Sequence, residues 1–275
     1  MTHSPMIAPG IYESLPMAEY HRPPGISKTG LDLINRSPAH YRWAKDHPAE
    51  DTTAFMVGRA FHTLVLEPHL ENQEIVMALP HDKRSKANAA AWQAFELEHA
   101  GKSILTTKQW DAVHYMAQSV YDHPTAGELV ETGKREVSAY WRDPVTSELC
   151  KTRPDNWNQR ENCIVDLKSA QSAQLEVIKP AMGRLRYHIS DHMGRTGMAE
   201  CGCPVDAYWF VVVEKEPPYC VASFELDRIS REAAADKFAE NMWTYHQAME
   251  SGDWHGYPLG IQTITLPGWA LTQSI

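Results

Sequence analysis

Two carboxylates and a lysine stand close together near the middle of the chain. Asp155 ends the β-type segment KTRPDNW, and Asp166 and Lys168 follow the apolar residues of the next segment, CIVDLKSA. Since alternate side chains of a strand share a face, we expect Asp166 and Lys168 to point the same way and Leu167 to enter the core. A hairpin would bring Asp155 to them. Two carboxylates at one end of a sheet can bind Mg²⁺, and an ammonium group beside them can help to activate a water molecule.

The composition is that of an ordinary globular protein. The chain has 275 residues, of which 43% are hydrophobic and 22% are charged. It contains no apolar run long enough for a membrane span, and its first residues lack the pattern of a secretory signal. Its five cysteines are odd in number and irregularly spaced, which favours a reducing environment over a disulfide framework. We therefore expect a cytoplasmic protein that does not contact a membrane.

The charge is unevenly distributed. The net charge of −9 argues against a general nucleic-acid binder. Residues 134–195, however, include 11 basic and 8 acidic side chains, whereas residues 201–275 include 4 basic and 10 acidic ones. The segment that carries the two carboxylates is thus the basic part of an acidic protein, although chance explains this difference equally well.

The periodicity of apolar residues predicts helices, then strands, then helices and strands in alternation. This order predicts an α/β fold, with a mixed central β-sheet flanked by helices. We expect an N-terminal arm at residues 1–24 and one domain at 25–275, with a helical part at about 25–132, a sheet core at about 133–228 and a C-terminal helix and tail at 229–275. Helices are expected at 27–36, 39–46, 51–66, 84–100, 106–121, 173–199 and 230–251, and strands at 137–141, 149–157, 162–168, 206–214 and 219–227.

An acidic residue at a strand end, followed about ten residues later by Asp/Glu-x-Lys, is typical of restriction-endonuclease-like nucleases. Asp155 and Asp166 are 11 residues apart. The Asp-x-Lys pattern is common by chance, so a solvated turn with an incidental Asp and Lys is the alternative. His62, in the segment GRAFHTLVLEP, is a candidate for the same site, although a single histidine on an apolar helix is more often part of a core.

Four segments in this order resemble the RecE-type (exonuclease VIII) nuclease domains, in the RecB-type branch of the PD-(D/E)XK nucleases. They are GISKTGLDLINRSPAHYRW, GRAFHTLVLEP, KTRPDNW and IVDLKSA. The resemblance runs from about Tyr20 to the C-terminal LPGWA, and four ordered motifs are more specific than any one of them.

The resemblance implies a role for each residue of the candidate site. His62 matches the histidine of the G-x-x-x-H helix motif, a metal-site residue. Asp155 and Asp166 match the two metal-binding carboxylates, and the backbone carbonyl of Leu167 is a further ligand. Lys168 matches the lysine that orients or helps deprotonate the attacking water.

Three further residues are additional candidates for this site. Glu136, at the head of the first strand, stands where such nucleases often carry another acid. Tyr187 and Asp191 lie in the segment that corresponds to a helix with a Q-x-x-x-Y motif. Ser190 and Gly194 stand at the expected positions of that Gln and Tyr, so the role of this helix stays open.

The resemblance also implies cofactors and partners. Mg²⁺ is the expected metal, with Mn²⁺ as a substitute. Some relatives bind an iron–sulfur cluster through four cysteines, one of them far upstream. Because no cysteine precedes Cys150, no such cluster is expected here. The expected partners are double-stranded DNA ends, a RecT-type single-strand annealing protein and further copies of this chain in a closed ring of three or four.

The expected activity is Mg²⁺-dependent exonucleolytic degradation of linear double-stranded DNA, 5′ to 3′, which leaves 3′ single strands for phage-type recombination by annealing. One alternative is a RecB- or Cas4-like nuclease with endonuclease or single-strand activity. Another is a non-catalytic DNA-binding recombination accessory protein.

Recognition of a DNA end needs groups that bind a terminal phosphate. Ser27, Lys28, Arg36 and Arg42, in the first helical pair, are candidates because helix N-termini and arginines suit phosphate. A solvated basic face explains each of them equally well. Three tryptophans are candidates for stacking on unpaired bases, although core packing is the more common role: Trp43, Trp141 and Trp157.

Overall fold

A computed structural model describes residues 7–22, 24–48, 51–80 and 86–268 of the protein. The strands in these ranges are β1 (Gly10–Tyr12), β2 (Ile75–Met77), β3 (Ser103–Leu105), β4 (Lys134–Arg135), β5 (Ser138–Arg142), β6 (Leu149–Thr152), β7 (Asn156–Asn158), β8 (Cys163–Ala170), β9 (Ala207–Glu214) and β10 (Val221–Glu225). The α-helices are α1 (Met17–Tyr20), α2 (Lys28–Arg36), α3 (Pro38–Asp46), α4 (Thr53–Leu66), α5 (Glu71–Glu74), α6 (Lys86–Glu98), α7 (Thr107–Asp122), α8 (Pro124–Glu131), α9 (Leu175–Arg184), α10 (Tyr187–Glu200) and α11 (Arg228–Ser251), and Pro68–Leu70 form a 3₁₀ turn.

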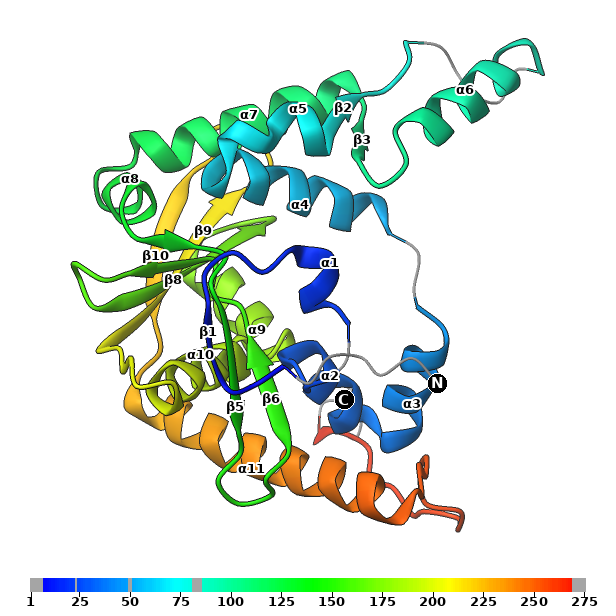
Figure 1. Cartoon of the computed structure of the whole chain (residues 1–275), viewed down its shortest axis with the longest axis vertical. Coiled ribbons are helices and arrows are strands. Elements are labelled where there is room, and N and C mark those ends of the chain that lie inside the picture. The colour runs from blue at the N-terminus through cyan, green and yellow to red at the C-terminus, as the bar shows by residue number, and fades with distance from the viewer. Residues whose placement is uncertain (1–6, 23, 49–50, 81–85, 269–275) are drawn as a thin grey trace, which may run out of the picture.

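A mixed sheet forms the centre of the fold, with the strand order β10-β9-β8-β7-β4 (Figure 1). Strands β8 and β9 are parallel, and the other neighbours are antiparallel. A parallel pair needs a long crossover, which α9 and α10 supply between β8 and β9. The predicted restriction-endonuclease-like architecture, a mixed sheet flanked by helices, is confirmed.

The alternation of side chains along β8 divides the core between the two faces of this sheet. Val165 and Leu167 pack with Phe61 of α4 and with residues of α7 and α8. Ile164 points to the opposite face and packs with Ile178 of α9 and residues of α10. Since both faces are covered by helices, the sheet is buried on both sides and only its ends and edges remain for a site.

A second sheet, of order β1-β5-β6, packs against α10 through β5 and β6. Trp141 of β5 and Cys150 of β6 form a core with Ile189 of α10 and Phe238 of α11. Gly197 lets α10 approach this sheet, because a Cβ there would lie 2.7 Å from the Trp141 ring. Figure 1 shows α11, in orange, running along one side of the molecule beneath these elements.

Most predicted helices are confirmed within a few residues. Ser27 caps α2, since its Oγ accepts a hydrogen bond from the amide of Gly30 at 3.4 Å. Residues 84 and 85 of the predicted helix at 84–100 lie outside the described residues. The predicted helix at 173–199 is wrong as a single element: Arg186 adopts a left-handed conformation, with φ of 55°, and divides it into α9 and α10.

The predicted strand at 149–157 is also wrong as a single element. Residues 149–152 form β6 of the second sheet, whereas residues 156–158 form β7 of the central sheet. Pro154 stands between them, and proline has no amide hydrogen for a strand ladder. The short elements β2, β3, β4 and α8 lack a strong periodic pattern and were not predicted.

Part of the expected N-terminal arm is integrated into the fold. Gly10–Tyr12 pair with β5 as an edge strand of the second sheet. At the other end, the amide of Ala39 donates to the carbonyl of His255 at 3.0 Å, and Trp254 stacks on Tyr41. Beyond them the ring of Tyr257 lies 5.9 Å from that of His40, and the large apolar side chains from residue 257 to 266 are exposed; the end of the LPGWA segment lies outside the described residues. No helix in the described ranges is long and apolar enough to cross a membrane.

Candidate metal centre

The hairpin of β7 and β8 brings the two predicted carboxylates together. The ladder pairs Asn156 with Val165, so Asp155 and Asp166 face each other one residue beyond its end. Side chains opposite each other on antiparallel strands lie about 5 Å apart at Cβ. The 11-residue spacing in the sequence thus becomes one acidic pair at the end of the central sheet.

Pro154 explains why this end of the sheet is open. It stands opposite Leu167, where the register of the hairpin would otherwise continue. The Leu167 amide donates instead to Asp155 Oδ2 at 2.6 Å, and the Leu167 carbonyl accepts from Lys168 Nζ at 3.1 Å. A backbone carbonyl is therefore directed to the same place as the carboxylates.

His62 and Glu136 complete the cluster from other elements. Nδ1 of His62, on α4, lies 3.5 Å from Asp155 Oδ1. Glu136 follows β4, has a positive φ of 52° and donates its amide to the Asp155 carbonyl at 3.1 Å. One ligand atom each from His62, Glu136 and Asp155 lie within 4.8 Å of one another.

The donors of this cluster fit a small divalent cation. Carboxylate and carbonyl oxygens are the ligands that Mg²⁺ and Mn²⁺ prefer, and an imidazole nitrogen is compatible with Mn²⁺. His62, Glu136 and Asp155 supply three such atoms. Asp166 is not a member of this group of three, but it stands opposite Asp155 in the hairpin register, and the Leu167 amide bonds to Asp155. The expected absence of an iron–sulfur cluster stays a prediction.

Asp166 has different partners from Asp155. Its Oδ1 accepts a hydrogen bond from Nζ of Lys168, and its Oδ2 accepts one from the hydroxyl of Tyr208 at 2.9 Å. Lys168 lies on the same face of β8 as Asp166, as the strand alternation predicts. Both oxygens of Asp166 are thus engaged by donors from β8 and β9.

The electrostatics of the cluster hold Asp155 ionised. Burial raises the pKa of Asp155, but the charges of His62 and Lys168 outweigh it and hold the pKa well below its usual range. Burial lowers the pKa of His62, and the Asp155 carboxylate outweighs that effect and raises it. The Asp155 carboxylate therefore favours the protonated form of His62, and a cation bound at this site would replace that proton.

The other acids bind protons more readily. Burial and the nearby Asp155 charge raise the pKa of Glu136 to about 8. Burial also raises the pKa of Asp166 to about 6, although Lys168 opposes the shift. Burial lowers the pKa of Lys168, but the two aspartates outweigh it and raise it. Such an excess of buried acid is the electrostatic situation that a bound cation relieves.

The structure separates the two additional candidates on α10. Tyr187 lies beside the site, with Lys168 Nζ 5.5 Å from the centre of its ring. Asp191 is buried and pairs with Arg195 at 2.8 Å, and it is outside the cluster of ligand atoms. Gly194 stands where a tyrosine was expected and instead leaves space for the ring of Tyr208.

The candidate phosphate-binding residues lie on α2 and α3, and none belongs to the cluster. The Ser27 hydroxyl is used as a helix cap. Lys28 donates to the Leu185 carbonyl and pairs with Asp32, each at 2.7 Å. Arg42 pairs with Asp46, and Arg36 is exposed. Phosphate binding by these four residues stays a prediction.

Two of the three candidate tryptophans are core residues. Trp141 and Trp157 are buried in the cores beside β5 and β7. Trp43 is 65% exposed and stacks on His47, so it alone of the three offers a ring face near the surface.

Sequence reasoning missed Arg153, Lys151 and Tyr208. Nε of Arg153 lies 3.9 Å from Oε2 of Glu136, and the guanidinium group also donates to the Leu15 carbonyl. Nζ of Lys151 donates to the Tyr20 and Arg22 carbonyls. Both basic residues belong to the KTRPDNW motif, so their closeness to Asp155 in the sequence was the signal that could have identified them. Nothing in the local sequence of β9 distinguishes Tyr208 from the other strand residues.

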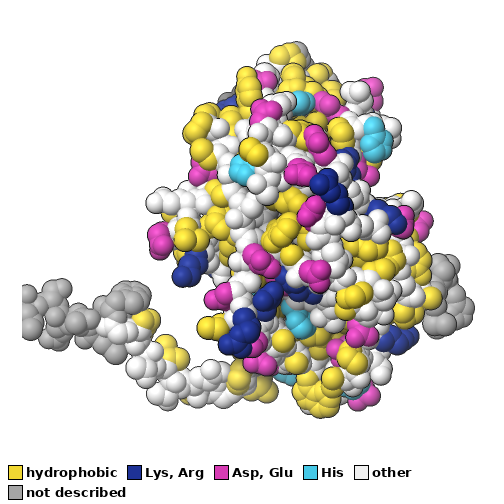
Figure 2. All heavy atoms as spheres, turned by 90° about the vertical axis from the view of Figure 1, so that its left-hand side faces the viewer, with side chains coloured by type: hydrophobic (Ala, Val, Ile, Leu, Met, Phe, Trp, Pro, Cys, Tyr) yellow, Lys and Arg dark blue, Asp and Glu magenta, His cyan; other side chains and the backbone are white. Residues whose placement is uncertain are grey.

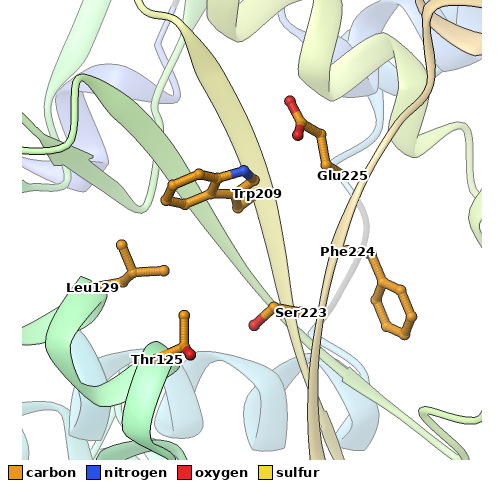
Figure 3. Close-up of a pocket in the computed structure, with 6 residues that line it drawn as sticks. All are labelled: Thr125, Leu129, Trp209, Ser223, Phe224 and Glu225. Carbon is orange, nitrogen blue, oxygen red and sulfur yellow. The ribbon is translucent and has the colours of Figure 1, made fainter.

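A cavity of about 200 Å³ lies apart from the cluster, between α8 and strands β9 and β10. Figure 3 shows Leu129 and Trp209 on one side of β10, whereas Phe224 points away from them. Trp209 follows Tyr208 in β9 and therefore faces the opposite side of the sheet. The candidate chemistry and this cavity are on different faces.

The face in Figure 2 carries acidic, basic and apolar side chains in a mixture, without one dominant basic area. A surface that follows a DNA backbone is normally rich in Lys and Arg. This face therefore gives no sign of a DNA-binding surface.

The fold and this site define a member of the PD-(D/E)XK nuclease superfamily, with Pro154-Asp155 and Asp166-Leu167-Lys168 as the two halves of its pattern. Residues 27–264 match the family described as PDDEXK-like domain of unknown function (DUF3799), and the chain belongs to this family. No curated protein has a significantly similar sequence. Membership in the RecE-type group stays a prediction.

One solved structure supports the fold. The crystal structure of a candidate exonuclease from Eubacterium rectale has a TM-score of 0.66 at 12% identity, over 95% of this chain and 99% of that chain. At this identity the likeness shows the fold alone. A phage-related exonuclease from Haemophilus somnus 129PT has a TM-score of 0.34 at 11% identity, over 63% of this chain and 92% of that chain, which is too low to carry an argument.

Proposed function

We propose that this protein is a divalent-metal-dependent exodeoxyribonuclease that degrades linear double-stranded DNA from 5′ to 3′ and leaves 3′ single strands. The observation that carries the proposal is the acidic pair Asp155 and Asp166 with Lys168 at the open end of the β7–β8 hairpin. Family membership supports phosphodiester hydrolysis. The preference for duplex ends rests on the sequence resemblance.

The residues of the cluster have distinct tasks in this proposal. Asp155, Glu136 and His62, with an oxygen of Asp166 and the Leu167 carbonyl, hold the cation, Mg²⁺ or Mn²⁺. A bound cation supplies positive charge for the scissile phosphate. Lys168 presents N–H donors beside the same acids, where it orients the attacking water or the phosphate. Because these groups act together, loss of any one is expected to lower the rate by orders of magnitude.

The test compares three DNA substrates: a linear duplex labelled at its 5′ end, the same duplex as a closed circle, and single strands. Each is incubated with Mg²⁺, with Mn²⁺ or with EDTA. We expect release of mononucleotides from the linear duplex only, in the presence of metal, and loss of this release in Asp166→Ala.

Other outcomes would contradict this proposal in recognisable ways. Nicking of the circle or preferential degradation of single strands would favour the RecB- or Cas4-like alternative. DNA binding that is unchanged in Asp166→Ala, without cleavage by the wild type, would favour the accessory-protein alternative.

The partners and the location are further parts of the proposal. We propose a cytoplasmic protein that forms a closed ring of three or four copies and delivers its 3′ strands to a RecT-type annealing protein. Multi-angle light scattering measures the mass in solution, and a mass of one 31.1 kDa chain would contradict the ring. Co-purification with a candidate annealing protein tests the second partner.

A further inference from the structure

We infer that Tyr208 is a positioning residue of the metal centre. It holds one oxygen of Asp166 from the neighbouring strand and so directs the other oxygen to the cation, and Gly194 supplies the space for its ring. The inference rests on the proposed function insofar as it takes the cluster to be a cation site.

The register of the central sheet places Tyr208 beside Asp166. In the parallel pair of β8 and β9, Ile164 stands opposite Tyr208 and Asp166 opposite Phe210. Tyr208 and Asp166 therefore share a face, one diagonal step apart. The Tyr208 hydroxyl donates to Asp166 Oδ2 at 2.9 Å, and the side chain is only 4% exposed. This contact is fixed by strand pairing.

The two donors on Asp166 differ in mobility. Tyr208 has a rigid ring and holds Oδ2, whereas Lys168 has a long flexible side chain and holds Oδ1. Lys168 also has a second acceptor, the Leu167 carbonyl at 3.1 Å. Lys168 can therefore leave Oδ1 without losing every partner, whereas Tyr208 has no room to move. Oδ1 is the oxygen that remains for a cation.

Packing around the ring removes the freedom of Tyr208. A Cβ added to Gly194 of α10 would lie 2.5 Å from Cε2 of Tyr208 and 3.2 Å from Cδ1 of Ile164. The ring of Phe210 lies 5.0 Å away on the same strand. The Tyr208 ring is thus confined between α10 and the sheet, and any larger residue at position 194 would press on it.

A hydrogen bond of this kind fixes the plane of a metal-binding carboxylate. Partners that orient a ligand in this way commonly change metal affinity by 10- to 100-fold when they are removed. Without the Tyr208 hydroxyl, Asp166 would rotate more freely and Lys168 would compete for both of its oxygens. The expected result is weaker cation binding with little change in the fold.

The first experiment measures Mn²⁺ binding to the metal-free full chain in the absence of DNA, by the electron paramagnetic resonance signal of free Mn²⁺. We expect Tyr208→Phe to weaken binding about 10-fold. The ring and its packing remain, so the protein still folds, with a melting temperature somewhat lowered by the unpaired oxygen of Asp166. Tyr140→Phe is the matched control. It also removes a buried hydroxyl, one that has no hydrogen-bond partner among the described residues.

A double-mutant cycle tests the role of Gly194. Gly194→Ala should weaken Mn²⁺ binding because its methyl group displaces the Tyr208 ring. In the Tyr208→Phe background the same change should weaken binding little further, because the hydroxyl that it displaces is already gone. Full additivity of the two changes would contradict the coupling between them.

The outcomes separate this inference from the proposed function. If Tyr208→Phe binds Mn²⁺ within twofold of the wild type, Tyr208 only packs and the inference is overturned, whatever the nuclease activity. If the wild type binds Mn²⁺ and Tyr208→Phe binds it weakly, but no DNA is cut, the proposed function fails and the inference stands. A wild type that binds no cation overturns both.

Discussion

Asp155 accepts a hydrogen bond from the backbone amide of Leu167 at 2.6 Å, although Asp155 directly precedes β7 and Leu167 lies in β8. Pro154 ends the regular pairing at this point, so a side-chain carboxylate takes the place of a backbone carbonyl. The first metal-binding candidate is therefore oriented by the main chain of the strand that carries the second. Oδ1 of Asp155 also lies 3.5 Å from Nδ1 of His62, so Asp155 is the central residue of the cluster.

Replacement of Asp155 by asparagine should reduce both activity and stability. The change removes the carboxylate that His62 and Lys168 keep ionised, and we expect nuclease activity to fall by about 1000-fold or more. The pKa of Asp155 is lower in the folded state, so its ionised form stabilises the fold above the unfolded pKa and this contribution is lost as the pH falls through the folded pKa. Asp155→Asn should accordingly melt at a lower temperature at pH 7, as calorimetry can measure; an unchanged activity would contradict the assignment.

Glu136 should make the metal-free protein less stable as the pH rises. Its pKa in the folded state is about 8, above the ordinary value of 4.5. Between these two pH values the carboxyl of Glu136 is protonated in the folded state and ionised in the unfolded state. Stability therefore decreases between pH 4.5 and 8, and Glu136→Gln should increase the free energy of unfolding at pH 8 by on the order of 2 kcal/mol.

Chemical denaturation in EDTA at pH 5 and at pH 8 measures this effect. The difference between Glu136→Gln and the wild type should be small at pH 5 and larger at pH 8. An equal difference at both pH values would show that the titration of Glu136 is not its cause.

His62 should matter for metal binding more than for folding. Its imidazole is partly exposed and lies among the ligand atoms of the cluster. We expect His62→Ala to weaken Mn²⁺ binding and to lower metal-dependent activity at least about 10-fold. His114→Ala is a suitable control, because His114 pairs with Glu71 outside the cluster at 2.9 Å. Full Mg²⁺-dependent activity in His62→Ala would remove His62 from the metal site.

Lys151 should hold the N-terminal segment against the second sheet. It is buried and donates to the carbonyls of Tyr20 and Arg22 at 2.6 and 2.9 Å. Lys151→Met keeps most of the side-chain volume but removes both hydrogen bonds, which leaves the Tyr20 carbonyl unpaired in a buried position at a cost of about 1–3 kcal/mol. Hydrogen exchange of residues 15–22 should become faster.

The control for this change is Lys102→Met, which removes a hydrogen bond from a lysine to a backbone carbonyl, that of Asn72, at another place. It should leave exchange at residues 15–22 unchanged. If Lys151→Met also leaves it unchanged, the segment is held by other contacts.

The sequence by itself determined what depends on local periodicity. The alternation in CIVDLKSA placed Asp166 and Lys168 on one face of β8 and Leu167 in the core, as the structure has them. The apolar spacing and the capping residue likewise determined α2. A period of 2 or 3.6 residues encodes which side of an element is buried, and that information is contained in each short segment.

Tertiary structure alone decided which distant residues meet. Only long-range packing brings α4 to the hairpin, so that His62 reaches Asp155, and only the register of β9 against β8 gives Asp166 its contact with Tyr208. The sequence likewise did not indicate that residues 149–158 are divided between two sheets, because the residue pattern of a strand does not identify its partner strand. Local sequence sets the face of each side chain, whereas strand order and register, which depend on the whole chain, set its neighbours.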